Sequence, residues 1–197
     1  FCVSGLLRAD YPSLADRGTT FGRIYMLEMN VNDPTGDAKL TCILDGDNAG
    51  GIADGFHSPD NITVTENYVY IQEDPNGYFD ANPAIQGWAI LYQYNLQTGE
   101  LKVVMECDED NPDNLKYGAG GKWEINGLID VTDIIGATEK TFICGAQVHG
   151  WEFDSSIPEA AANATRADGK KFFDPTAIAE GLADLEGSFL FVLTGLE

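Results

Sequence analysis

Apolar and β-branched residues occur along this chain in short runs, many of which alternate with polar residues. Clusters of Gly, Asn and Asp separate the runs, and these residues favour turns. Alternation with a period of two is typical of β-strands that are buried on one face. The sequence therefore predicts an all-β protein, with strands at residues 23–29, 39–44, 61–65, 68–73, 88–95, 101–106, 127–131, 141–146 and 188–194.

The order of these segments repeats along the chain. A strand, a Thr-Gly turn and a second strand occur at residues 22–43 and again at residues 87–105, and a third copy begins at residue 187. Short strands in repeating units of four are typical of a β-propeller. One four-stranded blade would consist of the strands within residues 61–106, and the next blade would start at Gly127.

We expect residues 1–197 to form part of one β-propeller domain. Propellers usually close with about 4–8 blades, whereas this sequence holds only about three to four. A further chain or domain would then complete the propeller. Residues 151–187 interrupt the strand pattern and predict a small helical insertion between strands. Asp174 suits a helix cap and Pro175 the first turn, so a helix is expected through residues 177–185.

The composition is that of a folded protein. Hydrophobic residues make up 44% of the 197 residues, which supplies a core and argues against disorder. No run approaches the roughly 20 apolar residues of a membrane helix, so a transmembrane protein is not expected. The sequence starts at Phe1 and Cys2 without Met, which we interpret as a processed protein or a fragment.

The charge balance narrows the choice of partners. There are 32 acidic and 11 basic residues, which give a net charge of −21. Such a surface repels the phosphates of nucleic acid, so nucleic acid is not expected as a partner. Cations are favoured partners. The alternative interpretation is a solvated acidic surface that keeps the protein soluble.

The four cysteines do not form a zinc motif. Cys2, Cys42, Cys107 and Cys144 are far apart in the sequence, with no close-spaced pair. Four cysteines allow three disulfide connectivities, and the spacing does not choose among them. Cys42 and Cys144 lie in apolar strand-like runs, where a buried free thiol is the ordinary interpretation.

Polar residues gather at one end of the first hairpin of the predicted blade. A two-residue turn would place Asn61 opposite Gln72. Asp60 would then lie opposite Glu73, with Asp74 one step beyond. Like charges that face each other destabilise a strand pair, and a hard cation would reverse that cost. Carboxylate and amide oxygens are ligands that Ca²⁺ prefers. The five residues therefore form a candidate calcium site, and the alternative is a pair of polar turns.

A second polar cluster is predicted in the following hairpin. Glu124, Asn126, Gln147 and His149 would lie at the same end of that hairpin. In a propeller the first strand of each blade lines the central channel, so both clusters would face one channel mouth. His149 is the candidate catalytic residue, because an imidazole can ligate a metal, contact a phosphate or transfer a proton.

Other catalytic motifs are missing from the sequence. It contains no nucleophile elbow, no phosphate-binding glycine loop and no zinc-protease motif. If the protein is an enzyme, we expect a bound metal to polarise a phosphoryl oxygen or to activate water.

The ordered motifs resemble those of the PhoX-type alkaline phosphatase family. Members carry a Pro-Asp-Asn strand before an aromatic-Ile-Gln strand that ends in Asp, as at residues 59–61 and 70–74 here. They also carry a Glu-x-x-Gly strand before a Gln-x-His segment, as at residues 124–127 and 147–149. The resemblance covers roughly residues 20–150, with a weaker echo at residues 186–193.

The resemblance implies a secreted, periplasmic or cell-surface propeller that binds calcium, with iron as a possible second metal. It implies hydrolysis of phosphate monoesters at the channel mouth, with the phosphate ester or another small anion held through the metal. By matching position, Asp60, Asp74 and Glu124 would be metal ligands, and His149 would lie near them. None of the four cysteines occurs in a motif that matches the iron-binding cysteine of the family.

Two functions remain open at this point. The first is a calcium-dependent phosphoesterase of the PhoX type, represented by its C-terminal part. The second is a calcium-stabilised extracellular propeller without catalytic activity, which would act as a surface, scaffold or filament subunit. The same carboxylates would then be structural ligands.

Overall fold

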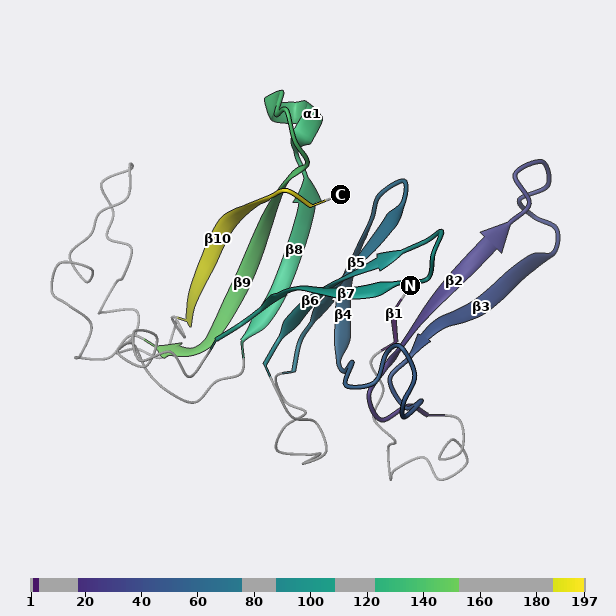
Figure 1. The fold of residues 1–197 in the computed structure, drawn as a ribbon, viewed down its shortest axis with the longest axis horizontal. Coiled ribbons are helices and arrows are strands. Elements are labelled where there is room, and N and C mark those ends of the chain that lie inside the picture. The colour runs from purple at the N-terminus through teal and green to yellow at the C-terminus, as the bar shows by residue number, and fades with distance from the viewer. Residues whose placement is uncertain (1, 4–17, 76–87, 109–122, 153–185, 197) are drawn as a thin grey trace, which may run out of the picture.

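The computed structural model describes residues 2–3, 18–75, 88–108, 123–152 and 186–196. The protein is all-β, as predicted, and its strands form three antiparallel sheets that lie side by side (Figure 1). The first sheet contains β1 (Cys2–Val3), β2 (Arg23–Met29) and β3 (Ala38–Asp45) in the order β1-β2-β3. The described residues do not form a closed propeller.

The central sheet has four strands in sequential order. It contains β4 (Pro59–Val64), β5 (Tyr68–Glu73), β6 (Ile90–Asn95) and β7 (Leu101–Glu106). This is the four-stranded unit predicted from the sequence. Asn61 pairs with Gln72 and Thr63 with Tyr70, as the predicted two-residue turn requires.

The third sheet has the order β10-β9-β8. It contains β8 (Glu124–Asp130), β9 (Thr141–Glu152) and β10 (Glu186–Thr194), and the short helix α1 (Thr132–Ile135) follows β8. The ends of the predicted insertion, residues 151–187, belong to β9 and β10. The helix predicted at residues 177–185 lies outside the described residues.

The central sheet is buried on both faces. Alternate residues of β5 point to opposite sides of the sheet, and those on each side pack into a different core. Val69 and Ile71 pack with buried residues of the first sheet and of the segment that follows it. Tyr70 lies on the other side and packs with buried residues of β8 and β9, including Phe142 at 5.0 Å between ring centroids. Two cores therefore hold the three sheets together, one on each face of β5.

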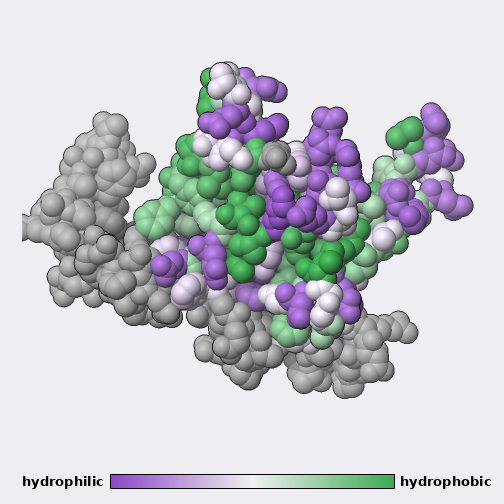
Figure 2. Space-filling view, in the orientation of Figure 1, coloured by the Kyte–Doolittle hydropathy of each residue, from purple (hydrophilic) through white to green (hydrophobic). Residues whose placement is uncertain are grey.

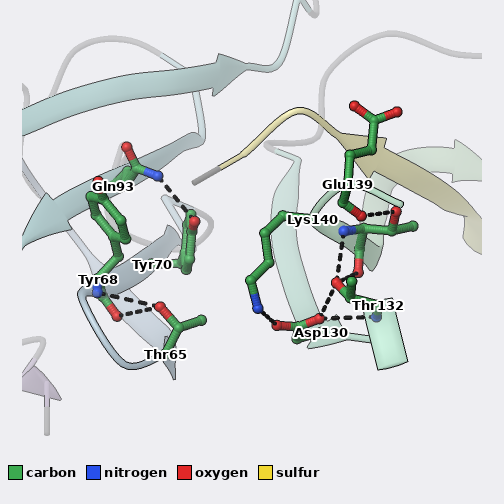
Figure 3. Close-up of polar contacts among 9 residues, drawn as sticks. Thr65, Tyr68, Tyr70, Gln93, Asp130, Thr132, Glu139 and Lys140 are labelled. Carbon is green, nitrogen blue, oxygen red and sulfur yellow. Dashed lines mark hydrogen bonds and ion pairs between the residues drawn. The ribbon is translucent and has the colours of Figure 1, made fainter. Parts of the chain in front are cut away.

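Polar side-chain contacts join neighbouring strands of the central and third sheets (Figure 3). The amide of Gln93 donates to the Tyr70 hydroxyl at 3.0 Å, which satisfies a buried polar pair between β5 and β6. Asp130 accepts from Lys140 at 2.7 Å and from the Thr132 hydroxyl at 2.6 Å. The hydrogen bond from Lys140 is the main cause that lowers the pKa of Asp130 to about 2. These contacts close the turn between β8 and β9.

A bulge in β8 allows two core residues to share one face. Ile125 and Leu128 are three positions apart, so a regular strand would turn one of them away from the core. Both are buried, because the pairing with β9 is irregular between Asn126 and Ile129. Gly127 lies within this irregularity with φ 59°, which is the left-handed region that favours glycine.

We predict that Gly127→Ala lowers the free energy of unfolding by about 1–2 kcal/mol, because a side chain there adopts a left-handed backbone at a cost. No atom lies within 4 Å of the added Cβ, so the loss comes from the backbone and not from a clash. Gly127→Asn is the control, and it should lose less because Asn tolerates this region. Urea denaturation measures both, and equal stability of all three proteins would contradict the bulge assignment.

Candidate functional site

Three carboxylates meet where the central sheet adjoins the third sheet. One oxygen each from Asp60, Asp74 and Glu124 lies within 4.8 Å of the other two. Asp60 belongs to β4, Asp74 directly follows β5, and Glu124 is the first residue of β8. The structure thus brings together the three residues that the family resemblance pointed to as metal ligands.

The pairing predicted for Asp60 is wrong by one position. Glu73 pairs with Pro59, and the register shifts between Pro59 and Asn61, so Asp60 is an extra residue in a bulge. Bulges bend a strand and redirect a side chain, and they occur often near functional sites. The bulge leaves Asp60 exposed and in the group with Asp74 and Glu124, and it removes the like-charged pair with Glu73 that the sequence predicted.

Glu73 does not join the three carboxylates. Its side chain is fully buried and accepts hydrogen bonds from the backbone amides of His57 at 2.8 Å and Ile90 at 3.0 Å. Burial raises its pKa well above the ordinary value for Glu. It therefore joins the segment before β4 to the start of β6, and its role is structural. This role could not be predicted from the sequence. Glu73 and Asp74 carry the same charge and face opposite sides of the strand, and nothing in the sequence marks which of them is buried.

Gln72 lies two residues before Asp74, and its side chain is buried. Its side chain is 1% exposed, and neither Oε1 nor Nε2 has a hydrogen-bond partner among the described residues. A buried amide without partners costs about 1–3 kcal/mol. Alternation along β5 places Gln72 on the side of Tyr70 and Asp74, which is the side that faces β8. An oxygen-seeking cation at this place would give Oε1 a partner.

Asn61 helps to orient one of the three carboxylates. Its amide donates to Asp60 at 2.6 Å, and its backbone pairs with Gln72 on the neighbouring strand. The sequence predicted Asn61 as a direct ligand. In the structure its side chain instead makes a supporting contact to Asp60.

β8 is positioned by its pairing with β9 and by a contact to the central sheet. Glu124 pairs with Gln147 of β9, so these two residues lie at the same end of the hairpin, as predicted. The hydroxyl of Thr63 on β4 donates to the carbonyl of Leu128 at 2.6 Å, and this bond joins the central sheet to β8. Sequence reasoning missed Thr63, because a threonine on a strand is too common to signal such a contact. His149 belongs to β9, and its side chain lies outside the described part of the structure.

The charge of this cluster would favour a bound cation. Three carboxylates at such short separation repel one another when they are ionised. A divalent cation would turn this repulsion into attraction, and the donor set consists of oxygen only, which suits Ca²⁺.

Cysteine does not contribute to this cluster in the described part of the chain. Cys42 and Cys144 are free thiols, and neither these two nor Cys107 belongs to the group formed by the carboxylates. Burial raises the pKa of Cys144 to about 11, so this thiol is protonated at neutral pH. The donor set that the structure brings together therefore fits calcium and gives no separate support for iron.

Comparison with known proteins gives no further assignment: no family model, no curated protein and no solved structure matches this chain. Among the described residues, no helix has the length and apolar character that crossing a membrane requires.

We predict that Glu73→Ala destabilises the protein by about 2–4 kcal/mol, because it leaves two buried backbone amides without an acceptor. Glu66→Ala, at an exposed residue of the turn between β4 and β5, is the control and should change stability little. Thermal unfolding followed by circular dichroism measures both. An unchanged melting temperature for Glu73→Ala would show that these hydrogen bonds do not hold the segment before β4.

Proposed function

We propose that this protein binds a calcium ion through Asp60, Asp74 and Glu124, and that it acts as a PhoX-like phosphoesterase on phosphate monoesters. The observation that carries the proposal is the meeting of three carboxylates from three separate segments within 4.8 Å. A second observation supports it independently. Gln72, two residues before Asp74, is buried, and its amide oxygen lacks a partner among the described residues.

The residues fit calcium better than other common metals. Ca²⁺ accepts several oxygen ligands in flexible geometry, and carboxylates with an amide carbonyl are typical donors. Zinc favours nitrogen and sulfur donors, which this cluster lacks among its described members. Asp60, Asp74 and Glu124 would hold the ion, with Oε1 of Gln72 as a further candidate donor.

The chemistry of the proposed reaction divides between the ion and the chain. A bound calcium ion would supply positive charge that offsets the charge of a phosphate ester. His149 is proposed to exchange a proton with the substrate or the leaving group, as a histidine can do near neutral pH.

The second candidate is a calcium-stabilised propeller without catalytic activity. One observation favours it: Asp60 and Asp74 come from the central sheet, whereas Glu124 comes from the third sheet. An ion bound to all three would fasten the two sheets together. In this candidate the three sheets are successive blades of a propeller, and the protein serves as an extracellular surface, scaffold or filament subunit.

We predict that calcium raises the melting temperature of the parent protein, because a ligand that binds only the folded state stabilises it by linkage. The gain is about 2.7 kcal/mol when calcium is present at about 100 times its dissociation constant. Glu124→Gln and Asp74→Asn should weaken calcium binding at least about tenfold, because each removes one of the charges that the ion neutralises.

Isothermal titration calorimetry measures the affinity, and calorimetric melting measures the stability. Asp37→Asn is the matched control, because this exposed carboxylate lies in the turn after β2 and outside the cluster. If calcium bound the parent and both cluster variants equally, the ion would not be held by these carboxylates.

We predict that the parent protein hydrolyses p-nitrophenyl phosphate in the presence of calcium and loses this activity with a chelator. His149→Ala should lower kcat about 100-fold or more, which is the usual contribution of a general acid or base. Absorbance of the released nitrophenolate measures the rate. Calcium binding without any hydrolysis by the parent would leave the non-enzymatic candidate and reject the phosphoesterase.

A further inference from the structure

The central and third sheets can be aligned strand by strand through one equivalent backbone hydrogen bond. The amide of Leu96, just after β6, donates to the carbonyl of Asn67, just before β5, at 2.9 Å. The amide of Gly195, just after β10, donates to the carbonyl of Lys140, just before β9, at 3.2 Å. The first residues of β5 and β9 are therefore equivalent, and β10 holds the place of β6.

The first and central sheets can be aligned as well, through a bulge that both contain. In the β6–β7 hairpin one extra residue, Val104, breaks the register after Leu91. In the β2–β3 hairpin one extra residue, Ile43, breaks the register after Ile24. The two bulges occupy the same place, so β2 is equivalent to β6, and Ile24 to Leu91. Both residues are buried toward the next sheet of the row.

This equivalence identifies the outer face of the third sheet. In the central sheet, Tyr70 and Leu91 pack against the third sheet and are fully buried. Their counterparts are Ile143, two residues into β9, and Leu190, four residues before the end of β10. Leu190 is 78% exposed, so the position that joins one sheet to the next is open to solvent here.

The exposed face is apolar and uncharged. Ile143 pairs with Ile129 of β8 on one side and with Val192 of β10 on the other, which forms a row across the sheet. Residues 141–147 and 188–194 contain no charged side chain in a protein of net charge −21. Hydrophobic surface gathers over the β8–β10 sheet in the space-filling view (Figure 2). An apolar patch of this kind marks an interaction surface.

The first sheet presents the matching face at the other end of the row. In the central sheet, Tyr92 and Tyr94 pack toward the first sheet. Their counterparts in β2 are Tyr25 and Leu27, and Leu27 pairs with Leu40 of β3. Leu27 is 49% exposed and Leu40 is 55% exposed. The face of the central sheet that packs on the first sheet therefore has a counterpart on the first sheet. That counterpart is the outer face of β2 and β3, and it is exposed.

We propose that two copies of this chain associate head to tail, with the outer face of β8–β10 in one copy packed on the outer face of β2–β3 in the other. Within the chain, one face of each sheet packs on the opposite face of the next sheet. The two exposed outer faces are the equivalents of these two packed faces, so we expect them to fit each other. A contact of this heterologous kind closes into a ring when the rotation allows it. Two copies would supply six sheets, which lies within the about 4–8 blades of closed propellers.

The test is sedimentation velocity of the intact chain and three variants over a range of concentrations. Leu190→Glu and Leu27→Glu each place a charge in one of the two faces, and each should weaken association at least about tenfold. Val31→Glu is the matched control, because Val31 is 89% exposed at the tip of the β2–β3 hairpin, outside both faces. Circular dichroism confirms that each variant is folded.

Mixing the two variants distinguishes head-to-tail packing from a symmetric contact. A pair that contains Leu190→Glu and Leu27→Glu retains one contact without any introduced charge, so the mixture should form dimers that neither variant forms alone. Added salt should strengthen association of the parent, because it screens repulsion between two acidic chains. A parent that stays monomeric, or a mixture that stays as dissociated as its components, would overturn the proposal.

Discussion

The structure depends on the burial of both faces of the central sheet. Strand β5 is the clearest case, since every residue from Val69 to Glu73 is buried. Val69 and Ile71 reach the first core, and Tyr70 reaches the second. Burying a large apolar side chain contributes about 1.5–3 kcal/mol, so this strand fixes the spacing of all three sheets. A change at β5 therefore affects two interfaces at once.

The candidate site follows from that spacing. The cores hold β4 and β5 against β8, and the hydrogen bond from Thr63 to Leu128 aligns them. The bulge at Asp60 then directs an acidic side chain into the junction between two sheets. The repulsion among the carboxylates is a cost of folding without a cation, and the buried amide of Gln72 adds to it. Both costs would fall if an oxygen-seeking cation bound, and the proposed function would then be connected to the stability of the sheet contact.

The strands and the carboxylate group could be predicted from the sequence for different reasons. Alternating apolar residues mark strands directly, so the approximate positions of β2 to β10 could be predicted. Asp60, Asp74 and Glu124 were accessible through ordered motifs that resemble a known family. The strand register at Asp60 could not be predicted, because a bulge has no reliable signal in one sequence. The burial of Glu73 on two backbone amides could not be predicted for a related reason: one sequence does not show which of two adjacent carboxylates points into the core.

The metal content of the protein purified without chelator is the measurement that tests the central claim most directly. Elemental analysis of the parent and of Glu124→Gln, prepared side by side, gives the calcium bound per chain. The account predicts about one calcium ion per chain in the parent and a clear loss in the variant, with circular dichroism unchanged. A parent that carries no calcium, and takes up none when it is added, would contradict the assignment of this cluster as a metal site.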